Sequence, residues 1–291
     1  AVQDILICPI SLSLMRDPVT LMQSGHTFDR ESLCQWLLIN PTRCPFTNVD
    51  YAVKLQYGDN IKIRQLLTLY YGDQAYQRYD DTTFYIRYEA MWNEDVYENI
   101  SAYLYGMNSK WIDWTSLQRT LMIDYQEDPV AVGFKSLLLH PDFFVSARLR
   151  KNENEALREW ERAQQLGLTV LVDAGNPWAQ WLQGMHNDII EEETEAARLL
   201  FQLAANQGLA LAQFSLGVIC EQDDRDFDQA ESFYLEAAAQ GHALAHYSIA
   251  MLYDEADFHI MRPHLVQAAT QGQAEALFYL GTINVESDIV A

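Results

Sequence analysis

The stretch ICPISLSLMRDPVT, Ile7 to Thr20, decides how the first part of this chain folds. A Cys-Pro-Ile opening is typical of a zinc-binding loop, but a Cys-x-x-Cys ligand pair needs its second sulfur where this sequence has Ser11. The candidate ligands are Cys8, His26, Cys34 and Cys44, and no two of them are closely spaced in the sequence. The sequence therefore predicts that this segment folds without a metal, and no cofactor is expected.

The residues that follow predict a small α+β unit, a β-hairpin with helices. An extended segment at 18–22 is followed by a turn, and the apolar spacing of TFDRESLCQWLL at 27–38 predicts a helix with Asp29 as its cap. A second loop, CPFTNVDY at 44–51, leads to a closing amphipathic helix. The predicted apolar face of this closing helix consists of Ile61, Leu66, Leu67 and Leu69.

Short motifs along this unit, CPIS, LMRDPV, SGHTFDR, LCQWL, CPFT and GDN, follow one another in a specific order and spacing. On these motifs residues 3–75 resemble the U-box family, the zinc-free relatives of RING fingers that act as ubiquitin ligases. The resemblance implies that hydrogen bonds between polar groups and a small core hold two loops in place of metal. It assigns this structural network to Ser24, His26, Asp29, Arg30 and Asn60.

The resemblance also implies a partner. U-boxes bind a ubiquitin-conjugating enzyme loaded with ubiquitin, through apolar residues of the first loop, a helix position and a proline of the second loop. Carried over to this sequence, these contacts are Ile10, Leu12, Trp36 and Pro45. Many family members have a long basic residue three positions after that proline, where this chain has Asn48, so weaker activation of the enzyme is expected.

Several of these residues have an alternative interpretation. Ile10, Leu12 and Trp36 could belong to the core, and Cys34 with His26 could form the nucleophile and base of a thioester-forming ligase. Because Cys34 lies among apolar helix positions, a buried structural thiol is favoured. No catalytic residue is expected on this chain, since a U-box ligase positions a reactive thioester and leaves the chemistry to the conjugating enzyme.

Charge divides the chain into two regions. Residues 1–75 contain six lysines and arginines against seven acidic residues, whereas the remainder has thirteen against thirty-four. A net charge of −22 excludes nucleic acid as a partner, because phosphate binding needs a basic surface. The apolar runs are too short to span a membrane. The four cysteines, three of them in the first fifth of the chain, are too few and too clustered for a disulfide framework, so a reducing, cytoplasmic location is favoured.

The last part of the chain repeats. The segments LVDAGNPWAQWLQG, AANQGLALAQFSLG, AAAQGHALAHYSIA and AATQGQAEALFYLG align glycines at intervals of 33, 33 and 31 residues, a period typical of stacked helical pairs. Residues 170–286 resemble the Sel-one-like tetratricopeptide repeats, which scaffold proteins and have no active site. The aligned glycines are Gly175, Gly208, Gly241 and Gly272, and the expected close-packing positions are Gly184, Gly217, Ala250, Gly281, Ala197, Ala204, Ala230 and Ala237.

The predicted fold is thus an α+β U-box at 1–75, a helical connector at 76–152 and all-α helical repeats at 153–291, beginning with a further helix at 155–167. The connector is rich in Trp and Tyr, and a structural role is favoured over a substrate-docking surface. The repeats are expected to hold partners, with a spacer or dimer support as the alternative. The acidic run 191–195 is expected to be a solvated face; if it binds, a basic partner is favoured.

The functional expectation is a ubiquitin ligase that recruits a ubiquitin-loaded conjugating enzyme and acts on a protein substrate held by the helical region. The alternative is a non-catalytic adaptor whose U-box no longer activates transfer, an interpretation that Asn48 keeps open. Sel-one-like repeats are common in bacteria, whereas ubiquitin is eukaryotic. A secreted bacterial effector acting in the host cytosol is therefore a further hypothesis.

Overall fold

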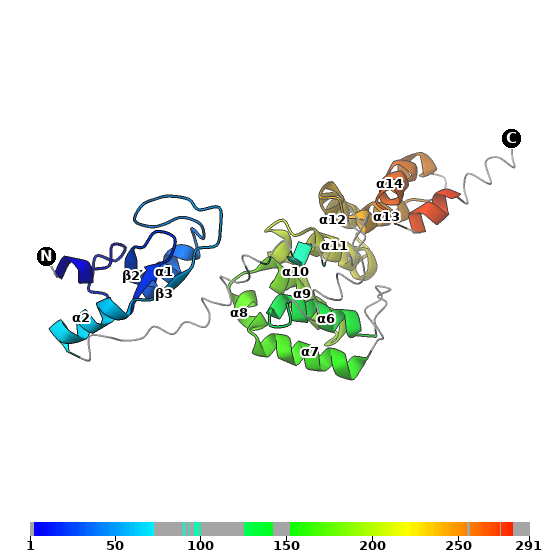
Figure 1. Cartoon of the computed structure of the whole chain (residues 1–291). Helices are drawn as coiled ribbons and strands as arrows, with labels where there is room; N and C mark the ends of the chain where they lie inside the picture. The colour runs from blue at the N-terminus through cyan, green and yellow to red at the C-terminus, as the bar shows by residue number, and fades with distance from the viewer. Residues whose placement is uncertain are drawn as a thin grey trace, which may run out of the picture. The chain divides into compact units, whose positions relative to one another are not determined.

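The structure, a computed structural model, describes residues 3–72, 125–141, 152–254, 257–273 and 275–281, together with a few positions between 90 and 100. The chain divides into two compact units, Ala1–Trp92 and Asn93–Ala291, drawn in Figure 1. Most of the segment predicted as a connector, 76–152, lies outside the described residues.

The N-terminal unit is a three-stranded sheet with helices around it. Strand β1 lies in the middle and pairs antiparallel with β2 on one side and with β3 on the other, in the order β2-β1-β3. The predicted β-hairpin, formed by β1 and β2, and the predicted helices are present, but β3 was not expected from the sequence. The elements are η1 (Gln3–Leu6, a 3-10 helix), β1 (Pro18–Leu21), β2 (Thr27–Asp29), α1 (Arg30–Leu37), β3 (Tyr57–Asp59) and α2 (Ile61–Tyr71).

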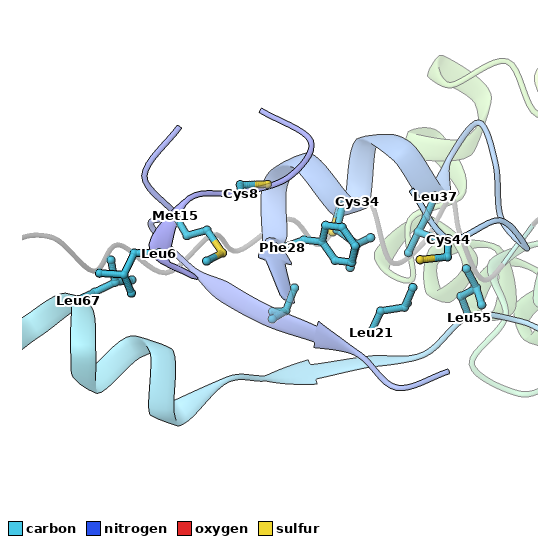
Figure 2. Packing of buried hydrophobic residues seen from close by; sticks show 12 residues of the cluster. Leu6, Cys8, Met15, Leu21, Phe28, Cys34, Leu37, Cys44, Leu55 and Leu67 are labelled. Carbon is cyan, nitrogen blue, oxygen red and sulfur yellow. The ribbon is translucent and has the colours of Figure 1, made fainter. Parts of the chain in front are cut away.

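A small apolar core holds these elements together. Figure 2 shows Cys8 and Cys44 in different parts of this cluster, with Cys34 from α1 and Phe28 from β2 between them. All four of these side chains are buried, and no disulfide joins the cysteines. Cys34 is thus a buried thiol with its sulfur 3.4 Å from the hydroxyl oxygen of Tyr57, as the structural interpretation predicts.

The buried face of helix α2 differs from the one predicted from the sequence. Leu67 is fully buried and Leu66 is partly buried, but Ile61 and Leu69 are 61% and 76% exposed. Ile63 packs against the core instead. The helical period puts residues 63 and 67 on one side, one turn apart, whereas 61 and 69 fall on the opposite side.

The helical unit consists of helices that pack against their neighbours in sequence. Contacts are extensive between α6 and α7, α9 and α10, α11 and α12, and α13 and α14, so the helices form pairs (Figure 1). The further helix predicted at 155–167 is confirmed as α7. The helices are α6 (Pro129–Leu139), α7 (Glu153–Gln165), α8 (Leu168–Asp173), α9 (Pro177–Ile189), α10 (Thr194–Ala205), α11 (Ala210–Ile219) with a π-helical turn η4 (Cys220–Asp224), α12 (Phe227–Ala239), α13 (Ala243–Met251) and α14 (Phe258–Thr270).

The second helix of each pair buries the same stripe. Its members are spaced i, i+4 and i+7, which places them on one face of a helix, and a large side chain stands between two smaller ones or, in α14, between Met and Ala. This shared register makes the unit a helical-repeat solenoid. The buried stripes are Ala156, Trp160 and Ala163 in α7; Ala197, Phe201 and Ala204 in α10; Ala230, Tyr234 and Ala237 in α12; and Met261, Leu265 and Ala268 in α14.

Glycines in the first helix of a pair allow close packing, as the repeat alignment predicts. A Cβ at Gly184 would lie 2.5 Å from the ring of Phe201, and a Cβ at Gly217 would lie 2.5 Å from the ring of Tyr234. Ala250 is fully buried. Gly281 differs from the prediction, because nothing lies within 4 Å of its Cβ position, and the described residues contain no later helix to pack against it.

The repeat register in the structure begins earlier than the aligned glycines indicate. Gly208 follows the last alanine of its stripe by four residues and has φ +90°. The equivalent glycine after α7 is Gly167, at φ +105°, whereas Gly175 follows the additional short helix α8. The pair α6–α7 is therefore a further repeat, and α6 belongs to the helical unit although the sequence placed it within the connector 76–152.

A repeated hydrogen bond joins successive helices. The Gln207 amide at the end of α10 donates to the side-chain oxygen of Gln180 in α9 at 3.0 Å, and Gln240 donates to Gln213 at 2.6 Å one repeat later. Each donor directly precedes the turn glycine. The bond satisfies a buried amide in each first helix, which would otherwise cost free energy.

Candidate functional site

Two loops of the N-terminal unit have the same backbone geometry. In the first, the Cys8 N–H donates to the Ser13 carbonyl at 2.8 Å and the Leu12 N–H donates to the Cys8 carbonyl at 2.9 Å. In the second, the Cys44 N–H donates to the Val49 carbonyl at 3.0 Å and the Asn48 N–H donates to the Cys44 carbonyl at 2.9 Å. Both begin with Cys-Pro, so the sequence similarity of CPIS and CPFT has a structural counterpart.

Leu12 and Asn48 occupy the same position of these loops, in the left-handed backbone region. Their φ angles are +55° and +56°, and both side chains are exposed, Leu12 to 79%. A left-handed leucine is strained, and a large apolar side chain held in solvent by a strained backbone is a typical feature of a contact surface. The core interpretation of Leu12 is therefore wrong.

The other predicted contact residues lie partly in solvent. Ile10, Trp36 and Pro45 are half-buried, and Ile10 and Trp36 also pack against the core. The indole N–H of Trp36 donates to the Arg43 carbonyl at 2.8 Å, which joins α1 to the base of the second loop. Trp36 is thus fixed in orientation and contributes both to the core and to the surface.

The base of the second loop is clamped by an ion pair. Arg43 donates to both carboxylate oxygens of Asp50, with its Nη2 2.7 Å from Oδ2. The same two residues form an antiparallel bridge. This clamp is exposed, so it contributes little to stability, but it holds the two ends of the loop together beside Trp36.

Asp29 connects the first loop to the sheet. Its carboxylate accepts from the backbone N–H groups of Arg16 and Asp17, at 2.7 and 2.9 Å, and its own N–H donates to the Cys8 sulfur at 3.3 Å. Asp29 does stand at the N-cap of α1, but its side chain makes no capping hydrogen bond. The predicted capping role is therefore wrong, because this carboxylate binds the chain that leaves the first loop.

Ser24 and His26 contact the second loop. Burial raises the pKa of the Cys44 thiol, but hydrogen bonds with the hydroxyls of Ser24 and Thr47 outweigh it, so the pKa lies below its usual value. The His26 ring lies 4.5 Å from the ring of Phe46. The turn between β1 and β2 thus touches the second loop through a polar and an aromatic contact.

Arg30 is the centre of a buried charge network. Its Nε donates to Asp17 at 2.6 Å, its Nη2 donates to Asp59, and its guanidinium lies 5.6 Å from the ring centroid of Tyr57. Arg64 approaches both carboxylates at 3.5 and 3.3 Å. Burial lowers the pKa of Arg30, but hydrogen bonds to the two carboxylates outweigh it and the net pKa is raised.

Asn60 joins three elements. Its amide donates to the hydroxyls of Thr20 in β1 and Thr27 in β2, at 2.9 and 3.0 Å, and its oxygen caps α2 by accepting from the Ile63 N–H at 3.0 Å. The network residues predicted from the sequence therefore act in separate groups, at the first loop, at the second loop and between the sheet and α2.

Sequence reasoning missed three members of this network, Asp17, Asp59 and Arg64. Two of them were visible as the Asp of LMRDPV and the Asp of GDN, since an acidic residue inside a motif flanking a buried arginine is a candidate partner.

The candidate zinc ligands are not brought together, and the described residues contain no group of three or more His, Cys, Asp or Glu side chains that could hold a metal.

In the helical unit, the acidic run 191–195, predicted as a solvated face, begins in the turn after α9 and ends in the first turn of α10. Glu191, Glu192 and Glu193 are exposed, and Arg198 bridges to Asp224 of the next repeat at 2.7 and 3.0 Å. The structure also bears on membrane insertion. Among the described residues, no helix has the length and apolar character required to cross a membrane.

Comparison with known proteins finds a family match for the N-terminal unit. The family model for the U-box domain matches residues 2–71. The chain is 43% identical over 60 residues to U-box domain-containing protein 8 of Arabidopsis thaliana, covering 21% of this chain and 16% of that protein. It is 41% identical over 61 residues to the E3 ubiquitin-protein ligase PUB24 of the same plant, covering 21% and 13%. The chain thus spans less than a fifth of the length of these relatives.

Solved structures are similar to the chain at low identity. A Sel1 repeat protein from Oxalobacter formigenes is 20% identical with a TM-score of 0.36, covering 72% of this chain and 75% of that one. The protective antigen c5321 of uropathogenic Escherichia coli, which displays an SLR fold, is 17% identical with a TM-score of 0.38, covering 77% and 64%. The repeat architecture described above follows from the helix register of this chain itself.

Proposed function

We propose, from the premise that residues 2–71 are a U-box domain, that this protein is a ubiquitin ligase. The observation that carries the proposal is the matched pair of Cys-Pro loops, which hold Leu12 and Asn48 in solvent in the same strained conformation. A surface fixed in this way suits a partner that must bind briefly and in one orientation.

The proposed partner is a ubiquitin-conjugating enzyme with ubiquitin on its active-site cysteine. Leu12 supplies the most exposed apolar contact, Ile10, Trp36 and Pro45 add partly buried ones, and Asn48 supplies an amide from the second loop. The ligase contributes positioning, because holding the thioester and an acceptor amine in place converts a bimolecular step into an effectively unimolecular one. No group on this chain forms a covalent intermediate with ubiquitin in this mechanism.

The proposed role of the helical unit is to hold the protein substrate. Its acidic character favours a substrate with a basic surface, since complementary charge raises the rate of encounter. The stacked helix pairs support this role because repeat solenoids offer extended binding surfaces. Because the reaction requires ubiquitin, the proposed site of action is the cytosol of a eukaryotic cell, whether the protein originates there or is delivered by a bacterium.

A non-catalytic adaptor is the second candidate, and Asn48 is the residue that favours it. Its side chain is shorter than the basic residue that the family resemblance leads one to expect. A panel of conjugating enzymes, each tested with ubiquitin, activating enzyme and the full chain, separates the two functions. A ligase forms ubiquitin chains or modifies itself with at least one enzyme of the panel, whereas an adaptor does so with none.

A further inference from the structure

From the start of α7 to residue 291 the chain contains no lysine, although Lys135 lies in α6. The five lysines are Lys54, Lys62, Lys110, Lys135 and Lys151, and from residue 152 to 291 every basic side chain other than histidine is an arginine. Lysine is among the commonest residues of soluble proteins and is mostly exposed. Its absence over this length, in a unit with many acidic residues, needs an explanation.

Guanidinium geometry explains some of the arginines. Arg198 binds both carboxylate oxygens of Asp224, at 2.7 and 3.0 Å, and Arg162 donates to the Gln126 carbonyl at 2.5 Å while lying beside Glu159. A lysine at position 198 would lose the second of two parallel bonds. At such positions the choice of arginine follows from the contact.

Two arginines have no such contact. Arg225, which directly follows the π-helical turn η4, and Arg262 in α14 are exposed, and the side chain of neither makes a hydrogen bond or ion pair in the described part of the chain. A lysine would provide the same charge and solubility at both positions. Fold stability therefore does not account for arginine there.

The lysines that the structure describes differ in access. Lys135 is buried and its ammonium lies 2.5 Å from Glu159, so it is held as a charged pair. Lys62 on α2 of the U-box is exposed. An accessible amine is thus present on the U-box, whereas no lysine occurs from α7 onward; Lys110 and Lys151 lie outside the described residues.

We propose that the repeats from α7 onward are kept free of lysine so that ubiquitin is transferred to the bound protein substrate and not to the surface that holds it. This inference rests on the proposed ligase function. Ubiquitin transfer needs a lysine ε-amine, which in its uncharged form attacks the thioester carbonyl carbon. A C–N isopeptide bond forms, the C–S bond to the conjugating enzyme breaks, and the departing thiolate takes up the proton that the amine nitrogen loses. A guanidinium, which stays protonated, cannot take part.

The test introduces lysines at constant charge. Arg225→Lys and Arg262→Lys are prepared in the full chain, with Arg225→Gln and Arg262→Gln as matched controls that remove the charge and add no amine. Each protein is incubated with ubiquitin, activating enzyme and a panel of conjugating enzymes, and ubiquitinated lysines are mapped by peptide mass spectrometry. Discharge of ubiquitin to the free amino acid lysine is measured in parallel.

The expected result is ubiquitin on Lys62 in every variant, and on the introduced lysine of at least one of Arg225→Lys and Arg262→Lys. If discharge to free lysine proceeds while both introduced lysines stay unmodified, the repeats lie beyond the reach of the loaded enzyme and the inference is wrong. If the parent chain supports no discharge with any enzyme, the proposed ligase function fails, and this inference fails with it.

Discussion

At the scale of single residues, the structure separates Leu12 from Ile10 as contact residues: the surface interpretation suits Leu12 better than it suits Ile10. Leu12 is nearly fully exposed, whereas Ile10 is half-buried and packs on the core. Truncating Ile10 to Ala would therefore alter stability and binding together. Leu12 is the cleaner probe, because an exposed side chain contributes little to the folded state.

Leu12→Ala is expected to weaken binding of a conjugating enzyme by about tenfold or more, because small transient interfaces rely on a few apolar anchors. Its thermal unfolding midpoint should match that of the parent. Titration of the enzyme monitored by NMR or calorimetry measures the affinity. Leu69→Ala is the control, since Leu69 is 76% exposed on α2 and should bind like the parent; equal affinity of all three proteins would remove Leu12 from the site.

Arg30→Met is expected to lower the free energy of unfolding by about 3–5 kcal/mol, because it leaves the buried carboxylate of Asp17 without its closest cation. Arg43→Met breaks the exposed pair with Asp50 and should leave the free energy of unfolding nearly unchanged. Denaturant unfolding of both variants measures the difference. Similar small losses would show that the buried network does not hold the U-box.

The sequence predicted individual network residues better than their partners. Asp29, Arg30 and Asn60 stand inside recognisable motifs, but the sequence cannot show that Arg30 meets Asp59, because the turn and pairing of β3 bring these distant positions together. The capping role of Asp29 was wrong for the same reason. A nearby helix start is visible in the sequence, whereas the backbone of the first loop that competes for the carboxylate is not.

At the scale of elements, close helix packing is the feature that the repeat alignment predicted most directly. Gly217→Ala is expected to destabilise the helical unit by about 1–3 kcal/mol, because its new Cβ would meet the Tyr234 ring. In an open helix position the same change should be neutral or stabilising, since alanine favours helix more than glycine. Gly281→Ala provides that control, with nothing within 4 Å of the Cβ position.

Chemical or thermal unfolding of these two variants is the measurement. Gly217→Ala should unfold at lower denaturant concentration than the parent, and Gly281→Ala should not. A Gly217→Ala protein as stable as the parent would mean that Tyr234 moves freely and that the helices are not tightly packed there.

The first repeat shows why the sequence register was incomplete. The α6–α7 pair escaped the alignment because α8 separates the two glycines that a regular repeat would combine, Gly167 and Gly175. Its stripe also has Trp160 where other repeats have Phe201 or Tyr234. The first repeat thus keeps the pattern of buried positions along its second helix, although the amino acids at those positions differ.

At the scale of the whole molecule, acid should destabilise the helical unit. Burial, with a smaller contribution from His140, lowers the pKa of His186 to about 4. Burial, with a contribution from His246, lowers the pKa of His242 to about 3. These folded-state values lie below the unfolded value of about 6.5, so the unfolded chain binds more protons in acid.

The stability from these two histidines is therefore complete above about pH 6.5 and is lost progressively as the pH falls from there, toward about 4 for His186 and about 3 for His242. Unfolding free energies measured from pH 7.5 to 4.5 test this. His186→Gln should flatten the dependence, whereas His259→Gln, at an exposed position of α14, should retain the parent's slope. A parent-like slope in His186→Gln would mean that its buried imidazole does not govern the response.

The most direct test of the ligase function is a single-turnover discharge assay. A conjugating enzyme is loaded with ubiquitin, the loading step is stopped, and loss of the thioester in the presence of free lysine is followed with and without the full chain. The account predicts that the chain accelerates discharge from at least one enzyme of a panel and that Leu12→Ala removes the acceleration while Leu69→Ala keeps it. Discharge at the unassisted rate with every enzyme, by a chain shown to be folded, would contradict the account.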